Sequence, residues 1–394
     1  MRKTAEQPFK NLGISPENSA LLCLDGGGVR GIMTIQLLKA LEARAGVPCH
    51  QIFDMVTGTS TGGIIAGLIA SGRNATEIEA LYKTFVAKVF TKRDLFANQI
   101  FNPPAWTKAS YRKILKETLG DVTLEETCRR TGIDLLITAH DVAEGEETFF
   151  SFQSQRSEAQ NTYRSVLLRA ALEATMSAPT YFTPMERFVD GGTTTYNNPS
   201  LAAVLEAVEY GAGQYRSDRL SVFSFGTGCN TQLIAPKDVA DPPGPDAKFW
   251  LNWVMVESGN DASDMQSDLF RSKLSPVRDY RRFQISLDRA AIAKLPDLPL
   301  GAVDATDANQ LSELTDKELA SIHLDNVAYF PVMTIIGQAV VAFLQQNSRD
   351  TGRSMFGYDL VNAEGKELLV TRAGEVAKIA QNLGNPAWVD GLPV

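Results

Sequence analysis

The sequence predicts an α/β protein with three layers, α/β/α, around a mainly parallel central sheet. Short apolar runs such as residues 20–24 and 134–139 have the length and composition of buried strands. Segments with helical periodicity alternate with these runs as far as about residue 230. Glycine-rich turns follow three of the expected strands, at 25–31, 58–62 and 226–228. Because sites in such sheets gather at the carboxyl ends of the strands, we expect these turns to form one site.

The first half of this region alternates strand and helix. Residues 20–24 are continuously apolar, and the segment after the first glycine turn repeats apolar residues at Ile32 and Ile35. A second strand ends at the turn that begins with Gly58. Asn74 is of a residue type that often caps the N-terminus of a helix. The expected elements are, in order, strand 20–24, helix 32–41, strand 51–57, helix 63–70, helix 74–89, helix 111–119, strand 134–139 and strand 147–152.

The second half continues the alternation and then loses it. The expected elements are helix 165–176, strand 187–189, helix 199–209 and strand 220–225, followed by helices at 248–274, 313–322 and 332–346. We therefore expect three parts. Residues 1–18 are polar and form a loose N-terminal arm, residues 19–230 form the α/β core, and residues 231–394 form a C-terminal extension packed on the same domain.

Composition excludes several classes of function. The net charge of −8 argues against nucleic acid as a partner, although a local patch could still contact a membrane surface. The four cysteines are widely spaced without a C-x-x-C pair, so we expect no metal site. The first apolar run is too short for a signal peptide, and no run approaches a membrane span. These features predict a cytoplasmic protein.

Aromatic and basic residues interleave between residues 90 and 110, for instance at Phe101, Trp106 and Lys108. Such a segment could form a lip that faces lipid. We favour the alternative, an irregular segment that packs its aromatic side chains into the core.

Residues 51–70 contain the G-x-S-x-G pattern between an expected strand and an expected helix. This context is typical of a nucleophile elbow. Gly58 and Gly62 leave room for a sharp turn, so Ser60 can expose its hydroxyl in a strained conformation. The amide of Thr61, at the start of the helix, would then face developing negative charge. The pattern alone also fits a tight glycine turn without chemistry.

The turn at residues 25–31 presents several amides near a helix N-terminus, as an anion site does. Its spacing of Gly26, Gly28 and Gly31 also satisfies the dinucleotide-binding fingerprint, but the second strand lacks the acidic end that the fingerprint requires. We therefore prefer an oxyanion hole formed near Gly27 and Gly28. Arg30 either reinforces the positive field of this loop or is an exposed arginine at the start of a helix.

A serine nucleophile needs a base, and the three histidines are poor candidates. His50 lies at the far end of the strand that leads to Ser60, and His140 has the sequence context of a structural residue. His323 falls at a helix end in the C-terminal region. Asp190 ends a short strand and is followed by two glycines. Alone it fits a turn aspartate, but beside the glycine loop and the elbow we favour a catalytic base.

Three ordered motifs resemble the patatin-like phospholipases, whose core is shared with the catalytic domain of cytosolic phospholipase A2. They are Asp25-Gly-Gly-Gly-Val-Arg-Gly31, Gly58-Thr-Ser-Thr-Gly62 and Asp190-Gly-Gly192, with further matches at 120–124, 177–182 and 197–199. The resemblance covers roughly residues 20–230. The chain departs from the family at 171–176, where Ala-Leu-Glu-Ala-Thr-Met replaces a shorter Ala-Arg-Ala-Thr-Ser-like run.

The resemblance implies a phospholipase A that hydrolyses lipid acyl esters through an acyl-enzyme, without histidine, metal or cofactor. Ser60 would be the nucleophile and Asp190 the base. The oxyanion hole would be formed by Gly26, Gly27, Gly28 and Thr61, and the supporting motif residues would be Arg30, Gly31, Gly58, Gly62, Gly191 and Gly192. The implied partners are a phospholipid or other acyl-lipid substrate, a membrane surface in transient contact, which would place the protein peripherally, and an activator.

Three alternatives stay open from the sequence. The first is a nucleotide-binding oxidoreductase that uses the loop from Gly26 to Gly31. The second is a binding module with an inactive hydrolase site, which the intact serine–aspartate pair argues against. The third is a bacterial effector phospholipase that is switched on by a small signal or a host partner.

Overall fold

The computed structural model describes residues 6–89, 108–179, 181–229, 247–277, 279–296 and 322–351, with residues 311, 314, 315, 318 and 319. The expected lip at 90–110 lies outside these residues except for its last three positions, and so do much of the expected helix 313–322 and the junction near residue 230.

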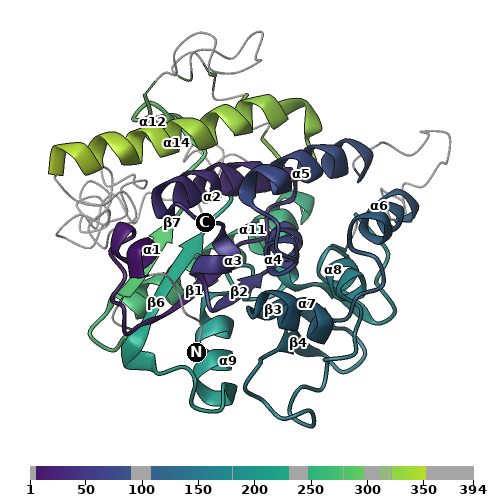
Figure 1. Ribbon diagram of the computed structural model, residues 1–394. Helices are drawn as coiled ribbons and strands as arrows, with labels where there is room; N and C mark the ends of the chain where they lie inside the picture. The colour runs from purple at the N-terminus through teal and green to yellow at the C-terminus, as the bar shows by residue number, and fades with distance from the viewer. Residues whose placement is uncertain are drawn as a thin grey trace, which may run out of the picture.

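Seven strands in the described part of the chain form one sheet. Six of them lie in the order β4-β3-β2-β1-β6-β7 (Figure 1), and β5 pairs with β3. The strands are β1 Ser19–Leu24, β2 Met55–Gly58, β3 Asp134–Asp141, β4 Glu146–Phe152, β5 Phe188–Asp190, β6 Leu220–Phe225 and β7 Asp279–Phe283. Five neighbouring strands are parallel to one another, namely β3, β2, β1, β6 and β7. Strands β4 and β5 are antiparallel to β3. The predicted mainly parallel sheet is confirmed.

Helices cover both faces of this sheet, which gives the predicted three layers. Alternate side chains of β1 point to opposite faces, so Leu22 and Leu24 join one hydrophobic cluster and Leu21 and Cys23 the other. The larger cluster includes residues of α2 Gly31–Ala45, α4 Thr61–Ala70, α5 Ala75–Val89, α6 Ala109–Leu119, α8 Leu168–Thr175 and α14 Phe330–Thr351. The smaller cluster includes residues of α9 Ser200–Tyr210 and α11 Ala247–Arg271.

The remaining helices are short. They are α1 Glu6–Asn11, η1 Gly28–Arg30, α3 Cys49–Ile52, α7 Leu124–Thr131, η2 Gly191–Thr193, η3 Ser217–Arg219, α12 Arg289–Ile292 and η5 Val327–Tyr329. Helix α14 lies across α2, on the outside of the molecule (Figure 1). The stretch from Val327 to Gln346, which comprises η5 and most of α14, is long and apolar enough to cross a membrane by length and composition, but 44% of its apolar segment is buried inside the protein.

Two expectations were wrong in detail. Within the expected loose arm, residues 6–11 form α1, and Phe9, Leu12 and Ile14 are buried in the larger cluster. Their apolar side chains are too few and irregularly spaced to stand out in a polar segment. The second strand begins at Met55 rather than at residue 51, because residues 49–52 form the short helix α3 after Pro48.

Candidate active site

Ser60 lies in the turn between β2 and α4 and has a φ of 52°, a left-handed value that is rare outside glycine. The flanking glycines, Gly58 and Gly62, permit this turn because the backbone passes so close to each of them that a side chain would not fit. A Cβ atom on Gly58 would lie 2.2 Å from the Gly62 carbonyl oxygen, and one on Gly62 would lie 2.2 Å from the Leu24 carbonyl oxygen. The strand, sharp turn and helix of a nucleophile elbow are therefore present as the sequence predicts.

The end of α8 packs against this elbow and holds Ser60 from the other side. The amide of Ser60 donates a hydrogen bond to the Thr175 hydroxyl oxygen at 2.7 Å. The Ser60 Oγ lies 3.9 Å from the Met176 Sδ. Ser60 is half-buried, so its hydroxyl sits at a partly enclosed surface rather than deep in the core.

Asp190 ends β5 and is 4% exposed. Its carboxylate Oδ1 accepts a hydrogen bond from the Gly192 amide at 2.7 Å, and its own amide donates to the Ser177 carbonyl at 3.1 Å. Burial raises the pKa of the Asp190 carboxyl to about 7, although hydrogen bonds from the Ser60 side chain and the Gly192 amide act in the opposite direction. The structure thus brings the predicted nucleophile and the predicted base together, 130 positions apart in the chain.

The histidines occupy other places. His50 is on α3, before β2, whereas Ser60 follows this strand. His140 pairs with Val189 across β3 and β5, so its side chain points to the opposite face from the Ala139–Asp190 pair. His323 is exposed. Their positions agree with the expectation that the base is Asp190.

The glycine loop reaches the elbow from the end of β1. A Cβ atom on Gly26 would lie 3.2 Å from the Ser60 Cβ. The Gly26 amide, however, donates to the Asn197 carbonyl at 3.2 Å, which differs from the expectation that this amide belongs to an oxyanion hole. Among the hydrogen bonds of the described residues, none uses the amides of Gly27 and Gly28. These two amides, and that of Thr61 in the first turn of α4, are therefore candidate donors to an oxyanion.

Neighbouring groups hold the glycine loop tightly. A Cβ atom on Gly27 would lie 2.0 Å from the Thr227 Oγ1, and one on Gly28 would lie 2.0 Å from the Leu324 carbonyl oxygen. Gly28 also has a φ of 54°. The Tyr82 hydroxyl donates to the Gly28 carbonyl and is 2.7 Å from the Thr61 Oγ1, so it bridges the loop and the elbow helix. The close packing of the protein's own groups therefore explains why glycine is required at positions 27 and 28. Binding of a dinucleotide is not needed to explain it.

The other predicted motif residues lie around the same point. A Cβ atom on Gly31 would lie 2.7 Å from the Thr61 Cγ2, and one on Gly191 would lie 2.3 Å from the Thr138 Oγ1. A Cβ on Gly192 would lie 3.0 Å from the Asn197 Oδ1.

Arg30 lies beside the glycine loop, where the buried Nε has no hydrogen-bond partner among the described residues. Burial lowers the pKa of the Arg30 guanidinium to about 10, and it stays protonated at neutral pH. It therefore adds positive charge next to the loop and is not the exposed arginine of the alternative.

Four neighbours of the site were not predicted as site residues. Thr175, Tyr82, Asn197 and Thr227 each make the hydrogen bonds or close approaches just described. Asn197 stood in a motif that signalled its position, and Thr227 stood in a glycine turn, but nothing in the sequence around Tyr82 distinguishes it from a core tyrosine.

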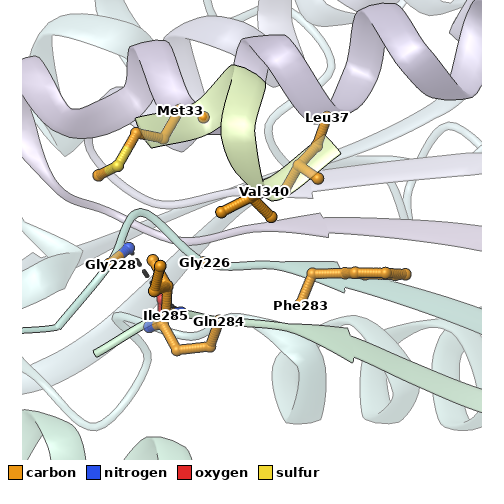
Figure 2. Close-up of a pocket in the computed structure, with 9 residues that line it drawn as sticks. Met33, Leu37, Gly226, Gly228, Phe283, Gln284, Ile285 and Val340 are labelled. Atoms are coloured by element: carbon orange, nitrogen blue, oxygen red, sulfur yellow. Dashed lines mark hydrogen bonds between the residues drawn. The ribbon is translucent and has the colours of Figure 1, made fainter. Parts of the chain in front are cut away.

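A small apolar cavity of about 20 Å³ lies behind the Gly226–Gly228 turn, between α2, α14 and the end of the sheet (Figure 2). Met33, Leu37, Phe283 and Val340 are among the residues that line it. Its volume is close to that of one water molecule, so it cannot hold an acyl chain in this conformation. Within the described residues, no group of three or more potential metal ligands was found.

Residues 22–204 match the model of the patatin-like phospholipase family. The chain is 32% identical over 247 residues to the 85/88 kDa calcium-independent phospholipase A2 of Rattus norvegicus, covering 57% of this chain and 29% of the relative. It is 32% identical over 199 residues to the cUMP-AMP-activated phospholipase of Escherichia coli, covering 48% of this chain and 58% of the relative. The chain thus spans less than two thirds of either protein.

Among solved structures, human GIVD cytosolic phospholipase A2 is similar with a TM-score of 0.40 and 12% identity, covering 90% of this chain and 63% of that chain.

Proposed function

We propose that the protein is a lipid acyl-ester hydrolase of the phospholipase A type, because residues 22–204 match the model of the patatin-like phospholipase family. Ser60 and Asp190 form its catalytic dyad. The observation that carries this proposal is the buried Asp190 carboxyl, with a pKa of about 7, in interaction with a serine on a left-handed elbow. Such a carboxylate is a much better base at neutral pH than an exposed aspartate.

The reaction follows from these positions. Asp190 takes the proton from the Ser60 Oγ as this oxygen attacks the ester carbonyl. The amides of Gly27, Gly28 and Thr61 stabilise the negative charge on the carbonyl oxygen, with support from the N-terminus of α4.

The tetrahedral intermediate then collapses. Protonated Asp190 returns its proton to the leaving alcohol, the lysolipid, and an acyl-enzyme remains on Ser60. Asp190 next deprotonates a water molecule, which attacks the acyl-enzyme and releases the fatty acid, and the proton returns to Ser60. The cycle needs neither histidine nor metal.

The first test is covalent labelling. Purified protein is treated with a fluorophosphonate, and the adduct is located by mass spectrometry. We expect a single adduct on Ser60, none in Ser60→Ala, and labelling at least about 100-fold slower in Asp190→Asn, the lower bound for loss of a general base. Asp218→Asn, an exposed aspartate on η3, is the matched control and should label normally. Rapid labelling of Asp190→Asn would reject the dyad.

The second test defines the substrate. Vesicles of phosphatidylcholine and phosphatidylglycerol are incubated with enzyme, and the products are identified by mass spectrometry. Phospholipase A activity releases a fatty acid and a lysophospholipid in equal amounts. Release of the head group instead, or saturable binding of NAD with an unreactive Ser60, would contradict the proposal.

We also propose that the protein acts in the cytoplasm, meets its lipid at a membrane surface and depends on an activator. The support is the similarity to the E. coli phospholipase whose name records activation by cUMP-AMP. Each assay therefore includes arms with cUMP-AMP and with membranes alone. Equal rates in all arms would reject both cUMP-AMP and a membrane surface as the activator.

A further inference from the structure

Arg282 lies on β7, well outside the segment that matches the family model. This strand is the last of the sheet order and runs beside β6 (Figure 1). Arg282 pairs with Ser224 on β6, which in turn pairs with Cys23 on β1, two residues before Asp25. This pairing of the strands places Arg282 level with the start of the glycine loop.

A buried bidentate ion pair connects Arg282 to this loop. The two terminal nitrogens of the guanidinium donate to the two carboxylate oxygens of Asp25, at 2.7 and 2.5 Å. The side chains are 1% and 3% exposed. A fork of this kind fixes both the position and the plane of the carboxylate. Asp25 immediately precedes Gly26 and Gly27, so the pair sets where the loop begins.

The same guanidinium reaches the other half of the site. It donates to the Ser263 Oγ on α11 at 3.0 Å, and this oxygen also accepts a hydrogen bond from the Asn198 side chain at 3.2 Å. The preceding residue, Asn197, accepts from the Gly26 amide, and its Oδ1 lies near Gly192 beside Asp190. One cation thus links the glycine loop to the turn that follows the base.

From these contacts we infer that Arg282 is a positioning residue, which holds the amides of Gly27 and Gly28 in register with Ser60 and Asp190. The inference rests on the proposed hydrolase function for its kinetic consequence, but not for its structural one. Displacement of catalytic groups by about 1 Å can lower a rate by about 100-fold. Lysine in place of Arg282 keeps the charge but cannot contact both carboxylate oxygens in one plane.

The structure provides a matched control on the same strand. Arg281 is also buried and pairs with Asp279, but its guanidinium binds the carbonyls of Leu12 and Gly13 and lies over the Phe223 ring. Arg281→Lys therefore removes a comparable buried fork on the opposite face of the strand, away from the glycine loop.

The first experiment measures hydrogen exchange of the full chain by mass spectrometry, without any substrate. In Arg282→Lys we expect peptides that cover residues 25–31 and 190–199 to exchange about 10-fold faster, the factor for a local loss of about 1.4 kcal/mol. Arg281→Lys should leave both peptides as in the unaltered protein. Unchanged exchange in Arg282→Lys, or an equal increase in Arg281→Lys, overturns the inference whether or not the protein is a hydrolase.

The second experiment measures kinetics per titrated Ser60. Arg282→Lys should lower kcat about 10- to 100-fold and leave KM within about twofold, because the loop acts on the transition state. The pH profile of kcat/KM should keep its midpoint, since Arg282 does not contact Asp190. Arg281→Lys should lower the melting temperature without changing kcat. An unchanged kcat in folded Arg282→Lys contradicts the positioning role.

Ser263→Ala tests the same inference if Arg282→Lys does not fold. It leaves the Arg282–Asp25 pair intact and removes only the link to Asn198, so the protein should fold. We expect faster exchange at residues 190–199 with little change at 25–31. Normal exchange at both peptides would reject the link between the two halves of the site. If the unaltered protein neither labels at Ser60 nor cleaves lipid, the proposed function fails, whereas the exchange result still decides the role of Arg282.

Discussion

The hydroxyl oxygen of Thr175 accepts the backbone N–H of Ser60 at 2.7 Å, and it thereby holds the elbow from a helix 115 positions away in the chain. Thr175 is fully buried. A buried amide without a partner costs about 1–3 kcal/mol. The contact therefore stabilises the left-handed backbone that exposes the serine hydroxyl.

Replacement of Thr175 tests this contact. Thr175→Val keeps the shape but removes the acceptor, so we expect a loss of about 1–3 kcal/mol in the free energy of unfolding and slower labelling of Ser60 by a fluorophosphonate. Thr175→Ser keeps the oxygen and is the control. Urea unfolding and the labelling rate measure the two effects. Equal behaviour of the valine and serine variants would show that the hydrogen bond does not hold the elbow.

The raised pKa of Asp190 predicts how hydrolysis depends on pH. The base must be ionised to accept the serine proton, so kcat/KM should rise with pH and level off above a midpoint near 7. The measurement is a series of initial rates between pH 5 and pH 9 with a soluble ester. A midpoint near 4 would mean that Asp190 is not the buried base.

The same pKa predicts a cost to stability. Between an unfolded value near 3.8 and a folded value near 7, the folded protein binds more protons than the unfolded chain, so stability falls as pH rises through this window. Asp190→Asn removes this dependence and keeps an oxygen for the Gly192 amide. Between pH 4 and pH 8, the free energy of unfolding of the unaltered protein should therefore fall by up to about 4 kcal/mol relative to that of Asp190→Asn. Parallel stability curves from urea unfolding would contradict this.

The buried pair of Lys108 and Glu173 lies next to Ser177, whose carbonyl accepts a hydrogen bond from the Asp190 amide. The Lys108 ammonium is 3.3 Å from the Glu173 carboxylate and donates to the Ser177 hydroxyl at 2.7 Å. Glu173→Gln leaves this buried cation without its anionic partner, so we expect a loss of about 3–5 kcal/mol in the free energy of unfolding.

The exposed pair of Lys113 and Glu117 on α6 is the control for this change. Glu117→Gln should leave the free energy of unfolding nearly unchanged. Chemical unfolding of both variants provides the comparison, and a cost for Glu173→Gln as small as that for Glu117→Gln would show that burial does not make the pair important.

Gly28 is expected to tolerate no side chain. Its φ is positive, and a Cβ would lie 2.0 Å from the Leu324 carbonyl oxygen. Gly28→Ala should therefore displace the glycine loop, lower the melting temperature and abolish Ser60 labelling. Gly132→Ala, at an open position with a φ of 72°, should cost only the backbone strain of about 1–2 kcal/mol. Full labelling of Gly28→Ala would show that the loop amides are not needed.

The sequence predicted the parts of the site that depend on local chemistry. The elbow around Ser60 and the glycine loop at residues 25–31 could be predicted because glycine spacing next to a strand restricts the backbone directly. Asp190 could be predicted because its turn stood out beside them. The arm at residues 6–14 and the helix at 49–52 could not, because short helices gain their stability from tertiary contacts rather than from a repeating pattern.

The amino-acid sequence by itself determined the three-layer architecture and the residue types that could carry chemistry, because periodicity and glycine spacing act within a few positions. The tertiary structure alone decided which groups meet. It placed Thr175 on the Ser60 amide, gave the Gly26 amide to Asn197, and brought Arg282 to Asp25 across the sheet. It also raised the pKa of Asp190, since burial is a property of all the surrounding elements together.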